Sequence, residues 1–359
     1  MAQTEEQKLI DMVVKSFVKE FGEGSASTLS KEFKPENVKA FVPTGNLALD
    51  WVIGRPGWPL GRISEIAGPY GSGKSTIIAR TLGAAQKEGA VCVLIDTEHS
   101  YDSTWSQFHG VDPERLILPQ PPHLQGVFDY IKLAITKIKE VQSTTPVFIA
   151  VDSVSGAPSA SEIESEDSTE GKQRAEHAKI ISEGLRKLSG LIWDQNVALV
   201  FVSQLKDNPG IMYGTQKSKI GGHAIEFHAG LMVEARRKGY LKEGGKDTTY
   251  GQTINVITVK NKFVPPFRTR NFDLYFEEGL RPKEILLDFL TDEGLFNPPL
   301  IKKAGGWFET QGAKYRAEDI AKMLGDDLME YAYQQLKLRP PYAMRGVTED
   351  QTKTDEQTS

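Results

Sequence analysis

Gly68-Pro-Tyr-Gly-Ser-Gly-Lys74-Ser75-Thr76 is the stretch that decides the fold of this chain. It fits the phosphate-loop pattern G-x-x-x-x-G-K-[ST], and it follows an apolar run, residues 63–67, that is typical of a strand. In such a loop, backbone N–H groups point at an anion and the next helix directs its positive end there. We therefore expect a phosphate-binding site made by Gly68, Pro69, Tyr70, Gly71, Ser72, Gly73, Lys74, Ser75 and Thr76.

The loop also predicts a magnesium site. Lys74 is expected to reach the β- and γ-phosphates, and the Ser75 hydroxyl is an oxygen ligand for Mg²⁺. Asp152 follows the apolar run 147–151 and is the expected acidic partner, which holds the ion through its water shell. The alternatives are a Gly-rich surface turn for the loop and a helix N-cap for Asp152.

Several apolar runs, residues 90–96, 147–151 and 197–202, alternate with helical periodicity and predict an α/β fold with a mainly parallel sheet. In such sheets the ligand lies at the carboxyl ends of the strands. Glu98 comes just after one strand, and we expect it to orient or deprotonate the attacking water. The alternative for Glu98 is a surface glutamate. Farther along, Asp102 and Trp105 are candidates for the adenine, with plain packing as the alternative for Trp105.

Composition limits the classes of protein that fit. The 359 residues include 43 Lys and Arg against 48 Asp and Glu, a net charge of −5, so nucleic-acid binding needs a local basic patch. The single cysteine, Cys92, has no partner for an internal disulfide, which suits a reducing compartment. Without a signal peptide or an apolar run of about 18 residues, we expect a cytoplasmic protein with no membrane partner.

Residues 205–222 follow Gln204 without a helical or strand period. They combine lysines for phosphates, Lys206, Lys217 and Lys219, with Tyr213 for base faces, as single-stranded nucleic-acid sites do. Disorder without function is the alternative. The acidic segment 153–174 is expected to be a solvated loop, followed by a helix at about 175–193.

The ends of the chain differ in character from the core. Residues 1–40 contain a predicted helix, near 5–20, with one apolar stripe, followed by an extended segment. An ATPase core is expected over 41–279, a small α+β domain over 280–342, and a disordered acidic tail over 343–359. Lys260 and Lys262 come at the end of a predicted strand. One interpretation is that they are solvated charges that keep a sheet edge from pairing with another chain.

With these residues in place, the chain resembles the RecA family of homologous-recombination ATPases from about Phe17 to near Leu324. The stretches that match, in order, are Phe21-Gly-Glu-Gly-Ser25, Pro43-Thr-Gly-Asn-Leu-Ala-Leu-Asp50, Gly68–Thr76, Leu94-Ile-Asp-Thr-Glu-His99, Ala150-Val-Asp-Ser-Val154, Phe201-Val-Ser-Gln204, Gly221-Gly222, Val259-Lys-Asn-Lys262 with Pro266-Phe267, and Lys303-Ala-Gly-Gly-Trp-Phe308. The chain departs from bacterial members at Glu226, where they carry a cation, and at Trp105, where they carry a tyrosine.

The resemblance implies roles for individual residues. Lys74, Ser75 and Asp152 would bind Mg-ATP, Glu98 would activate water, and Gln204 would sense the γ-phosphate. Lys260 and Lys262 would reach into the ATP site of the neighbouring subunit. DNA would be bound by Lys172 and Arg174 of a first loop and by a second loop with Lys206, Met212, Tyr213, Gly214, Lys217, Lys219, Gly221 and Gly222.

The expected function is that of a DNA-dependent ATPase that forms helical filaments of many copies on single-stranded DNA. Such a filament pairs the strand with a homologous double-stranded DNA and exchanges strands during repair. Its cofactors are ATP and Mg²⁺. The alternatives are a ring-forming helicase with the same core and a nucleotide-gated regulatory or assembly protein with little catalysis.

Overall fold

The structure is a computed structural model that describes residues 4–22, 38, 40–141, 144–164, 170–193, 195–207, 217–219, 224–242, 248–292, 294–295, 299–336 and 338. Within these ranges the side chains of residues 170–172, 174, 206–207, 217–219, 318 and 326 are not described. The chain divides into two compact units, Met1–Lys39 and Ala40–Ser359. The domain boundary expected near residue 280 stays a prediction.

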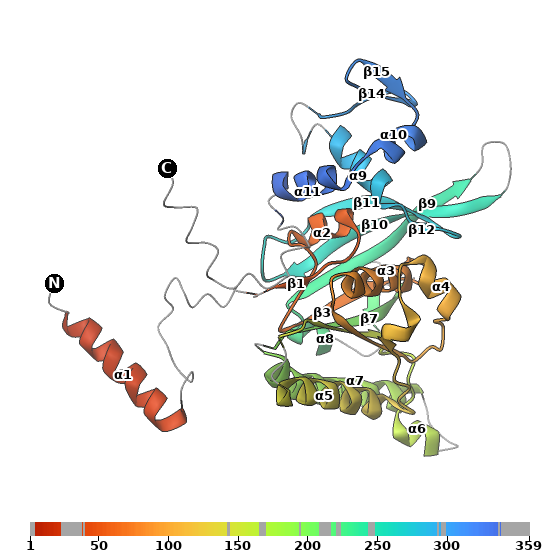
Figure 1. Cartoon of the computed structure of the whole chain (residues 1–359). Coiled ribbons are helices and arrows are strands. Elements are labelled where there is room, and N and C mark those ends of the chain that lie inside the picture. The colour runs from red at the N-terminus through yellow and green to blue at the C-terminus, as the bar shows by residue number, and fades with distance from the viewer. Residues whose placement is uncertain are drawn as a thin grey trace. The chain divides into compact units, whose positions relative to one another are not determined.

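The first unit contains the helix α1 (Glu5–Phe21), which is labelled in Figure 1. Thr4 caps its start, because the Thr4 side chain accepts a hydrogen bond from the backbone N–H of Gln7. One apolar stripe along α1 is solvent-exposed, and it consists of Leu9, Met12, Val13, Phe17 and Phe21. The helix predicted near residues 5–20 is thus present, with its apolar stripe unburied within this unit.

The second unit is built on one large sheet in the order β12-β11-β10-β9-β3-β7-β6-β4-β5. Its strands are β3 (Arg62–Gly68), β4 (Val91–Asp96), β5 (Leu116–Ile117), β6 (Val147–Asp152), β7 (Val197–Asp207), β9 (Leu231–Lys242), β10 (Thr249–Asn261), β11 (Thr269–Tyr275) and β12 (Gly279–Leu280). From β5 to β9 neighbouring strands are parallel, whereas β9 to β12 are antiparallel. The predicted mainly parallel α/β sheet is confirmed.

Helices cover both faces of the parallel part (Figure 1). The helices α5 (Leu124–Glu140), α7 (Glu170–Ile192) and α8 (Ala224–His228) pack on one face, where alternate strand residues such as Val93, Ile149 and Leu199 are buried. The helix α3 (Lys74–Lys87) lies on the other face, where the Cys92 thiol lies 3.7 Å from the carbonyl oxygen of Leu82. Burial on both faces explains the continuous apolar runs in the sequence.

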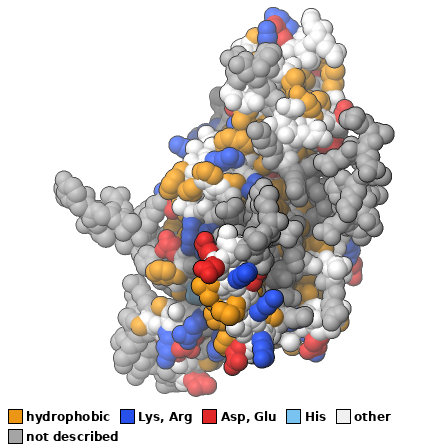
Figure 2. Space-filling model, turned by 90° about the vertical axis from the view of Figure 1, so that its left-hand side faces the viewer, with side chains coloured by type: hydrophobic (Ala, Val, Ile, Leu, Met, Phe, Trp, Pro, Cys, Tyr) orange, Lys and Arg blue, Asp and Glu red, His pale blue; other side chains and the backbone are white. Residues whose placement is uncertain are grey.

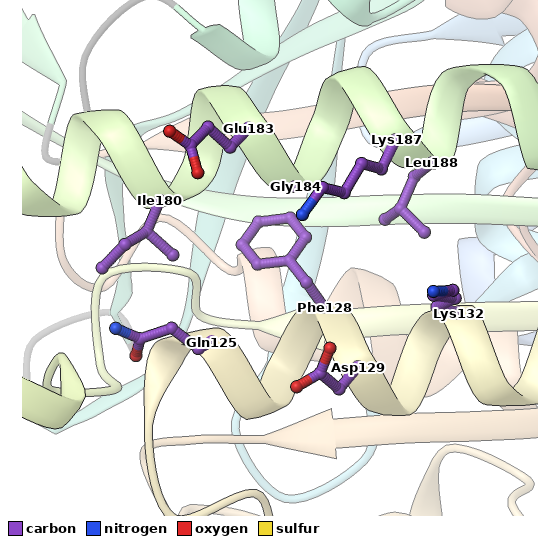
Figure 3. Close-up of a pocket in the computed structure, with 9 residues that line it drawn as sticks. All are labelled: Gln125, Phe128, Asp129, Lys132, Ile180, Glu183, Gly184, Lys187 and Leu188. Atoms are coloured by element: carbon purple, nitrogen blue, oxygen red, sulfur yellow. The ribbon is translucent and has the colours of Figure 1, made fainter.

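Figure 3 shows how α5 and α7 pack against each other. The Phe128 ring of α5 lies on the backbone of Gly184 in α7, where an added Cβ would come within 2.3 Å of the ring. A small cavity of about 160 Å³ beside the ring is bordered by Asp129, Lys132, Glu183 and other residues of the two helices. None of the predicted nucleotide-binding residues lines this cavity.

The C-terminal residues pack on the core where α9 (Pro282–Thr291) contacts α2 (Leu47–Ile53). Trp51 and Phe289 form an edge-to-face pair with centroids 6.3 Å apart, and the Tyr333 hydroxyl donates a 2.7 Å hydrogen bond to the buried Asp50. The remaining elements are β1 (Phe41–Val42), β2 (Trp58–Pro59), α4 (Ser103–Phe108), the 3₁₀ helix Pro113–Arg115, β13 (Lys302–Ala304), β14 (Trp307–Thr310), β15 (Ala313–Tyr315), α10 (Ala317–Met323) and α11 (Asp326–Gln335).

Two loop predictions are wrong in part. The segment 153–174 contains α6 (Ala160–Glu164) and the start of α7, at Glu170 rather than near residue 175. A capping box starts α6: the Ser159 N–H donates to the Glu162 carboxylate at 2.5 Å, and the Glu162 N–H donates to the Ser159 hydroxyl at 3.3 Å. The stretch 205–222 contains the end of β7 paired antiparallel with β8 (Lys217–Lys219). Backbone pairing forms this hairpin without the apolar alternation that would have revealed it.

In the described part of the chain, no helix is long and apolar enough to cross a membrane. On the face that Figure 2 shows, basic and acidic side chains lie interspersed rather than in separate fields. This distribution agrees with the small net charge of −5. The predicted tail, residues 343–359, lies outside the described residues.

Candidate functional site

The phosphate loop connects the end of β3 at Gly68 to the start of α3 at Lys74. Gly73 has φ +81°, a conformation that glycine adopts without strain, and no side chain caps α3. The first N–H groups of this 14-residue helix are therefore available to phosphate oxygens. The ammonium of Lys74 is buried and donates a 2.8 Å hydrogen bond to the Pro69 carbonyl; burial lowers the pKa of Lys74, which Asp152 and Glu98 counteract.

Oxygen donors meet beside this loop. Asp152 ends β6 and is 4% exposed, and its carboxylate accepts hydrogen bonds from the Ser75 hydroxyl and the Tyr101 hydroxyl. Burial is the main cause that raises the pKa of Asp152, and these two hydrogen bonds oppose it. A divalent cation would stabilise the ionised carboxylate, and hydroxyl and carboxylate oxygens are the donors that Mg²⁺ prefers. The residues present therefore fit Mg²⁺ with a nucleotide phosphate.

Glu98 lines the same cavity as Lys74. Its Oε1 accepts a 2.6 Å hydrogen bond from the Ser153 hydroxyl and a 3.0 Å hydrogen bond from Nε2 of Gln204. The Glu98 side chain thus connects the ends of three strands, because it follows β4, Ser153 follows β6 and Gln204 lies in β7. A carboxylate held in this way is exposed enough to meet water and placed to orient it.

An aromatic wall borders the same cavity, which has a volume of about 450 Å³. The wall consists of Trp105, His109, Tyr275 and Phe276. The rest of the lining includes Tyr70 to Thr76, Glu98, Asp152 and Gln204. Asp102 does not line the cavity; it caps α4 by accepting a 2.8 Å hydrogen bond from the Trp105 N–H. The cavity thus has a polar end for phosphates and an aromatic end for a base.

Comparison with known proteins agrees with this arrangement. The family described as the RecA N-terminal domain matches residues 8–281. The chain belongs to the RecA family. Proteins named "Protein RecA" from Chlorobaculum parvum, Symbiobacterium thermophilum and Sulfurovum sp. are 34%, 36% and 36% identical to it, over 89%, 84% and 89% of this chain and 88%, 82% and 86% of theirs.

Membership of the RecA family confirms several predictions at once. The protein is a DNA-dependent ATPase of homologous recombination and repair that uses ATP with Mg²⁺. It binds single-stranded and double-stranded DNA and forms filaments of its own copies. The ring-forming helicase and the regulatory protein with little catalysis are correspondingly disfavoured.

Other predicted residues of this RecA-family chain lie away from the cavity. Lys260 and Lys262 stand at the end of β10, and the Lys260 ammonium donates to the carbonyl oxygen of Glu226 in α8. Asn261 pairs with Leu231, which pairs with Ser64, four residues before Gly68. At about 3.3 Å per residue, these lysines are about 13 Å from the phosphate loop along the strands.

None of the predicted DNA-binding side chains is among those that the structure describes. Met212, Tyr213, Gly214, Gly221 and Gly222 lie outside the described residues. The backbones of Lys206, Lys217 and Lys219 belong to the β7–β8 hairpin, and those of Lys172 and Arg174 to the first turns of α7, but their side chains are not described. The pairing of β7 with β8 starts directly after Gln204, so a residue that lines the cavity and the segment predicted to bind DNA belong to one strand.

Sequence reasoning missed several residues of this RecA-family site: Tyr275 and Phe276 of the aromatic wall, and also Tyr101, His109 and Gln252. Tyr101 contacts Asp152, His109 lines the aromatic end, and Gln252 of β10 donates a 3.1 Å hydrogen bond to the Gly71 carbonyl. Burial, with Arg80 nearby, lowers the pKa of His109 to about 4, so its ring is neutral at pH 7. Spacing could have suggested the aromatic wall, because Tyr101, Trp105 and His109 recur every four residues. No sequence signal pointed to Gln252, which reaches the loop only through tertiary folding.

Proposed function

We propose that the cavity beside the phosphate loop is the ATP site and that it is completed in the filament by a neighbouring copy of the chain. Lys74 would bind the β- and γ-phosphates, while Ser75 and Asp152 would hold Mg²⁺, which neutralises phosphate charge. Glu98 would orient the attacking water, and Trp105 with Phe276 would contact the base. The observation that carries this proposal is the meeting of these groups in one cavity, from separate strands.

Within one subunit, Lys74 would exchange its bond with the Pro69 carbonyl for phosphate oxygens. This exchange replaces a neutral acceptor by an anionic one, so the Lys74 ammonium would gain the Coulombic attraction of the phosphate charge. Glu98 would accept the proton of the water that it orients. Its hydrogen bonds to Ser153 and Gln204 restrict the carboxylate to one direction.

Lys260 and Lys262 would act in the neighbouring subunit. Their position at the far end of β10, outside the cavity of their own chain, supports action across an interface. A cation supplied by another subunit stabilises charge on the transferring phosphoryl group, and in related reactions is worth about 10³–10⁵ in rate. Alanine versions of both lysines should therefore bind ATP but lose DNA-stimulated turnover.

Mixing two inactive variants tests this arrangement. One variant carries Lys74→Ala with intact interface lysines, and the other carries Lys260→Ala and Lys262→Ala with an intact phosphate loop. In a mixed filament, about one quarter of head-to-tail interfaces would join the two intact halves and hydrolyse ATP. If the mixture stays as inactive as each variant alone although the two variants assemble together in one filament on DNA, the shared site is wrong.

Gln204 would transmit the state of the nucleotide to DNA. Its amide contacts Glu98, and the strand that carries it continues into the β7–β8 hairpin. A γ-phosphate beside Glu98 would compete for the Gln204 amide and shift the strand that leads to the DNA loop. We also infer a cytoplasmic location, which rests on the single unpaired cysteine, Cys92.

A further inference from the structure

Tyr101 contacts both ends of the ATP cavity. Its hydroxyl lies 3.0 Å from Oδ2 of Asp152 and 3.2 Å from the carbonyl oxygen of Ser75. Both oxygens only accept hydrogen bonds here, so the phenol is the donor. On its other side, the Tyr101 ring forms an edge-to-face pair with Trp105, at 5.3 Å between centroids and 79° between planes.

The position of Tyr101 is itself restrained. Its backbone N–H donates a 3.0 Å hydrogen bond to Oδ2 of Asp96, and Oδ1 of the same carboxylate accepts a 3.2 Å hydrogen bond from the Glu98 N–H. Asp96 is 4% exposed at the end of β4 and therefore anchors the turn that carries both Glu98 and Tyr101. Tyr101 is thus fixed through its backbone N–H, its ring and its hydroxyl. A movement of Asp152 can therefore be passed through Tyr101 to Trp105.

We propose that Tyr101 is a positioning residue that fixes the Asp152 carboxylate for magnesium and links it to the aromatic wall of the base pocket. The Tyr101 hydroxyl occupies one lone pair of Oδ2, and the carboxylate lone pairs that neither Tyr101 nor Ser75 uses are left to the water shell of the ion. The ring supports Trp105 in the orientation in which it lines the cavity. This inference rests on the proposed ATP site.

The hydroxyl and the ring make separable predictions. Tyr101→Phe removes only the hydrogen bonds to Asp152 and Ser75, so it should weaken the magnesium-dependent part of nucleotide binding. Tyr101→Leu also removes the aromatic contact with Trp105, so it should additionally weaken binding that does not depend on the metal. Tyr130→Phe is the matched control, because Tyr130 is 42% exposed on α5 and lies outside the cavity.

The experiment measures ADP binding by titration calorimetry, once with excess Mg²⁺ and once with EDTA. The dissociation constant in EDTA divided by that with Mg²⁺ measures how much magnesium strengthens binding. For Tyr101→Phe, this ratio should fall about three- to tenfold, while the dissociation constant in EDTA stays within about twofold of the wild-type value. For Tyr101→Leu, the constant in EDTA should also rise. In turnover assays, Tyr101→Phe should need more Mg²⁺ for half-maximal rate but approach the wild-type kcat at saturating Mg²⁺.

Two results would overturn the inference. A Tyr101→Phe ratio equal to that of the wild-type protein would show that the hydroxyl does not position the metal carboxylate. An equal loss with Mg²⁺ and with EDTA, accompanied by a lower Tm, would show that Tyr101 only supports folding. The proposed ATP site fails separately, if wild-type binding of ADP does not depend on Mg²⁺ or if Ser75→Ala leaves that dependence unchanged.

Discussion

Nε2 of Gln204 donates a 3.0 Å hydrogen bond to Oε1 of Glu98, a residue 106 positions earlier in the chain. Glu98 is the candidate for orienting the attacking water, and Gln204 stands directly before the segment, starting at Leu205, that pairs with β8. One hydrogen bond thus connects the proposed water-orienting carboxylate to the strand that leads to the proposed DNA loop. We therefore expect a change at the γ-phosphate to reach the proposed DNA loop along this strand.

Replacing Gln204 should separate nucleotide binding from its effect on DNA. In Gln204→Ala the Glu98 carboxylate keeps its bond from Ser153, so ATP should bind with an affinity within about threefold of wild type. The gain in single-stranded DNA affinity caused by ATP should fall roughly 5- to 150-fold, the usual range for coupling between two sites. Fluorescence anisotropy of a labelled oligonucleotide, with ATP analogue and with ADP, measures this gain. An unchanged gain would place the coupling elsewhere.

Lys74→Ala should abolish ATP-dependent filament formation and strand exchange. The buried ammonium is the cation of the phosphate loop, and its loss should weaken ATP binding by at least about tenfold. Lys87→Ala is a suitable control, because Lys87 is an exposed lysine in the last turn of the same helix. Strand exchange at the wild-type rate by Lys74→Ala with ATP would be incompatible with the mechanism.

Tyr213→Ala should weaken binding to single-stranded DNA without affecting binding to ATP. Stacking of one base on an aromatic ring contributes about 1–3 kcal/mol, equivalent to roughly 5- to 150-fold in affinity. The measurement is oligonucleotide binding with a non-hydrolysable ATP analogue at fixed salt, with Tyr130→Ala as the control on α5. Equal DNA affinities for the two variants would count against the loop as a DNA site.

Asp50 should make stability depend on pH. Its side chain is fully buried, where it accepts hydrogen bonds from Tyr333 and Thr44, and burial raises the pKa of Asp50 from 3.8 to about 7. Between these two values the folded protein binds more protons than the unfolded chain, so the contribution of Asp50 to stability falls as pH rises and is lowest above pH 7.

Asp50→Asn should remove this pH dependence. The free energy of unfolding of the wild-type protein, minus that of Asp50→Asn, should fall by about 2–3 kcal/mol between about pH 5 and about pH 8. Urea unfolding at several pH values measures the difference, and Asp129→Asn on the exposed side of α5 is the control. A difference that is constant with pH would mean that Asp50 ionises as readily in the folded as in the unfolded state.

The sequence predicted those parts of the protein that depend on neighbours along the chain. The phosphate loop is one: its glycines, Lys74 and Ser75 have fixed spacing, and the strand and helix on either side follow from local periodicity. The parallel sheet was equally predictable, because strands buried on both faces must be apolar throughout. Asp152 and Gln204 could be expected at one sheet edge, since each ends or follows such a run.

Tertiary structure alone decided which distant side chains touch. The Tyr101 hydroxyl reaches Asp152 across 51 positions, and Gln252 reaches Gly71 across 181, from an antiparallel strand whose register no local pattern specifies. The same register places Lys260 and Lys262 outside the cavity of their own chain. Local periodicity depends on each residue's immediate neighbours and can be read from the sequence. Contacts between strands depend on which elements come together and in what register, and that is determined only when the whole core packs.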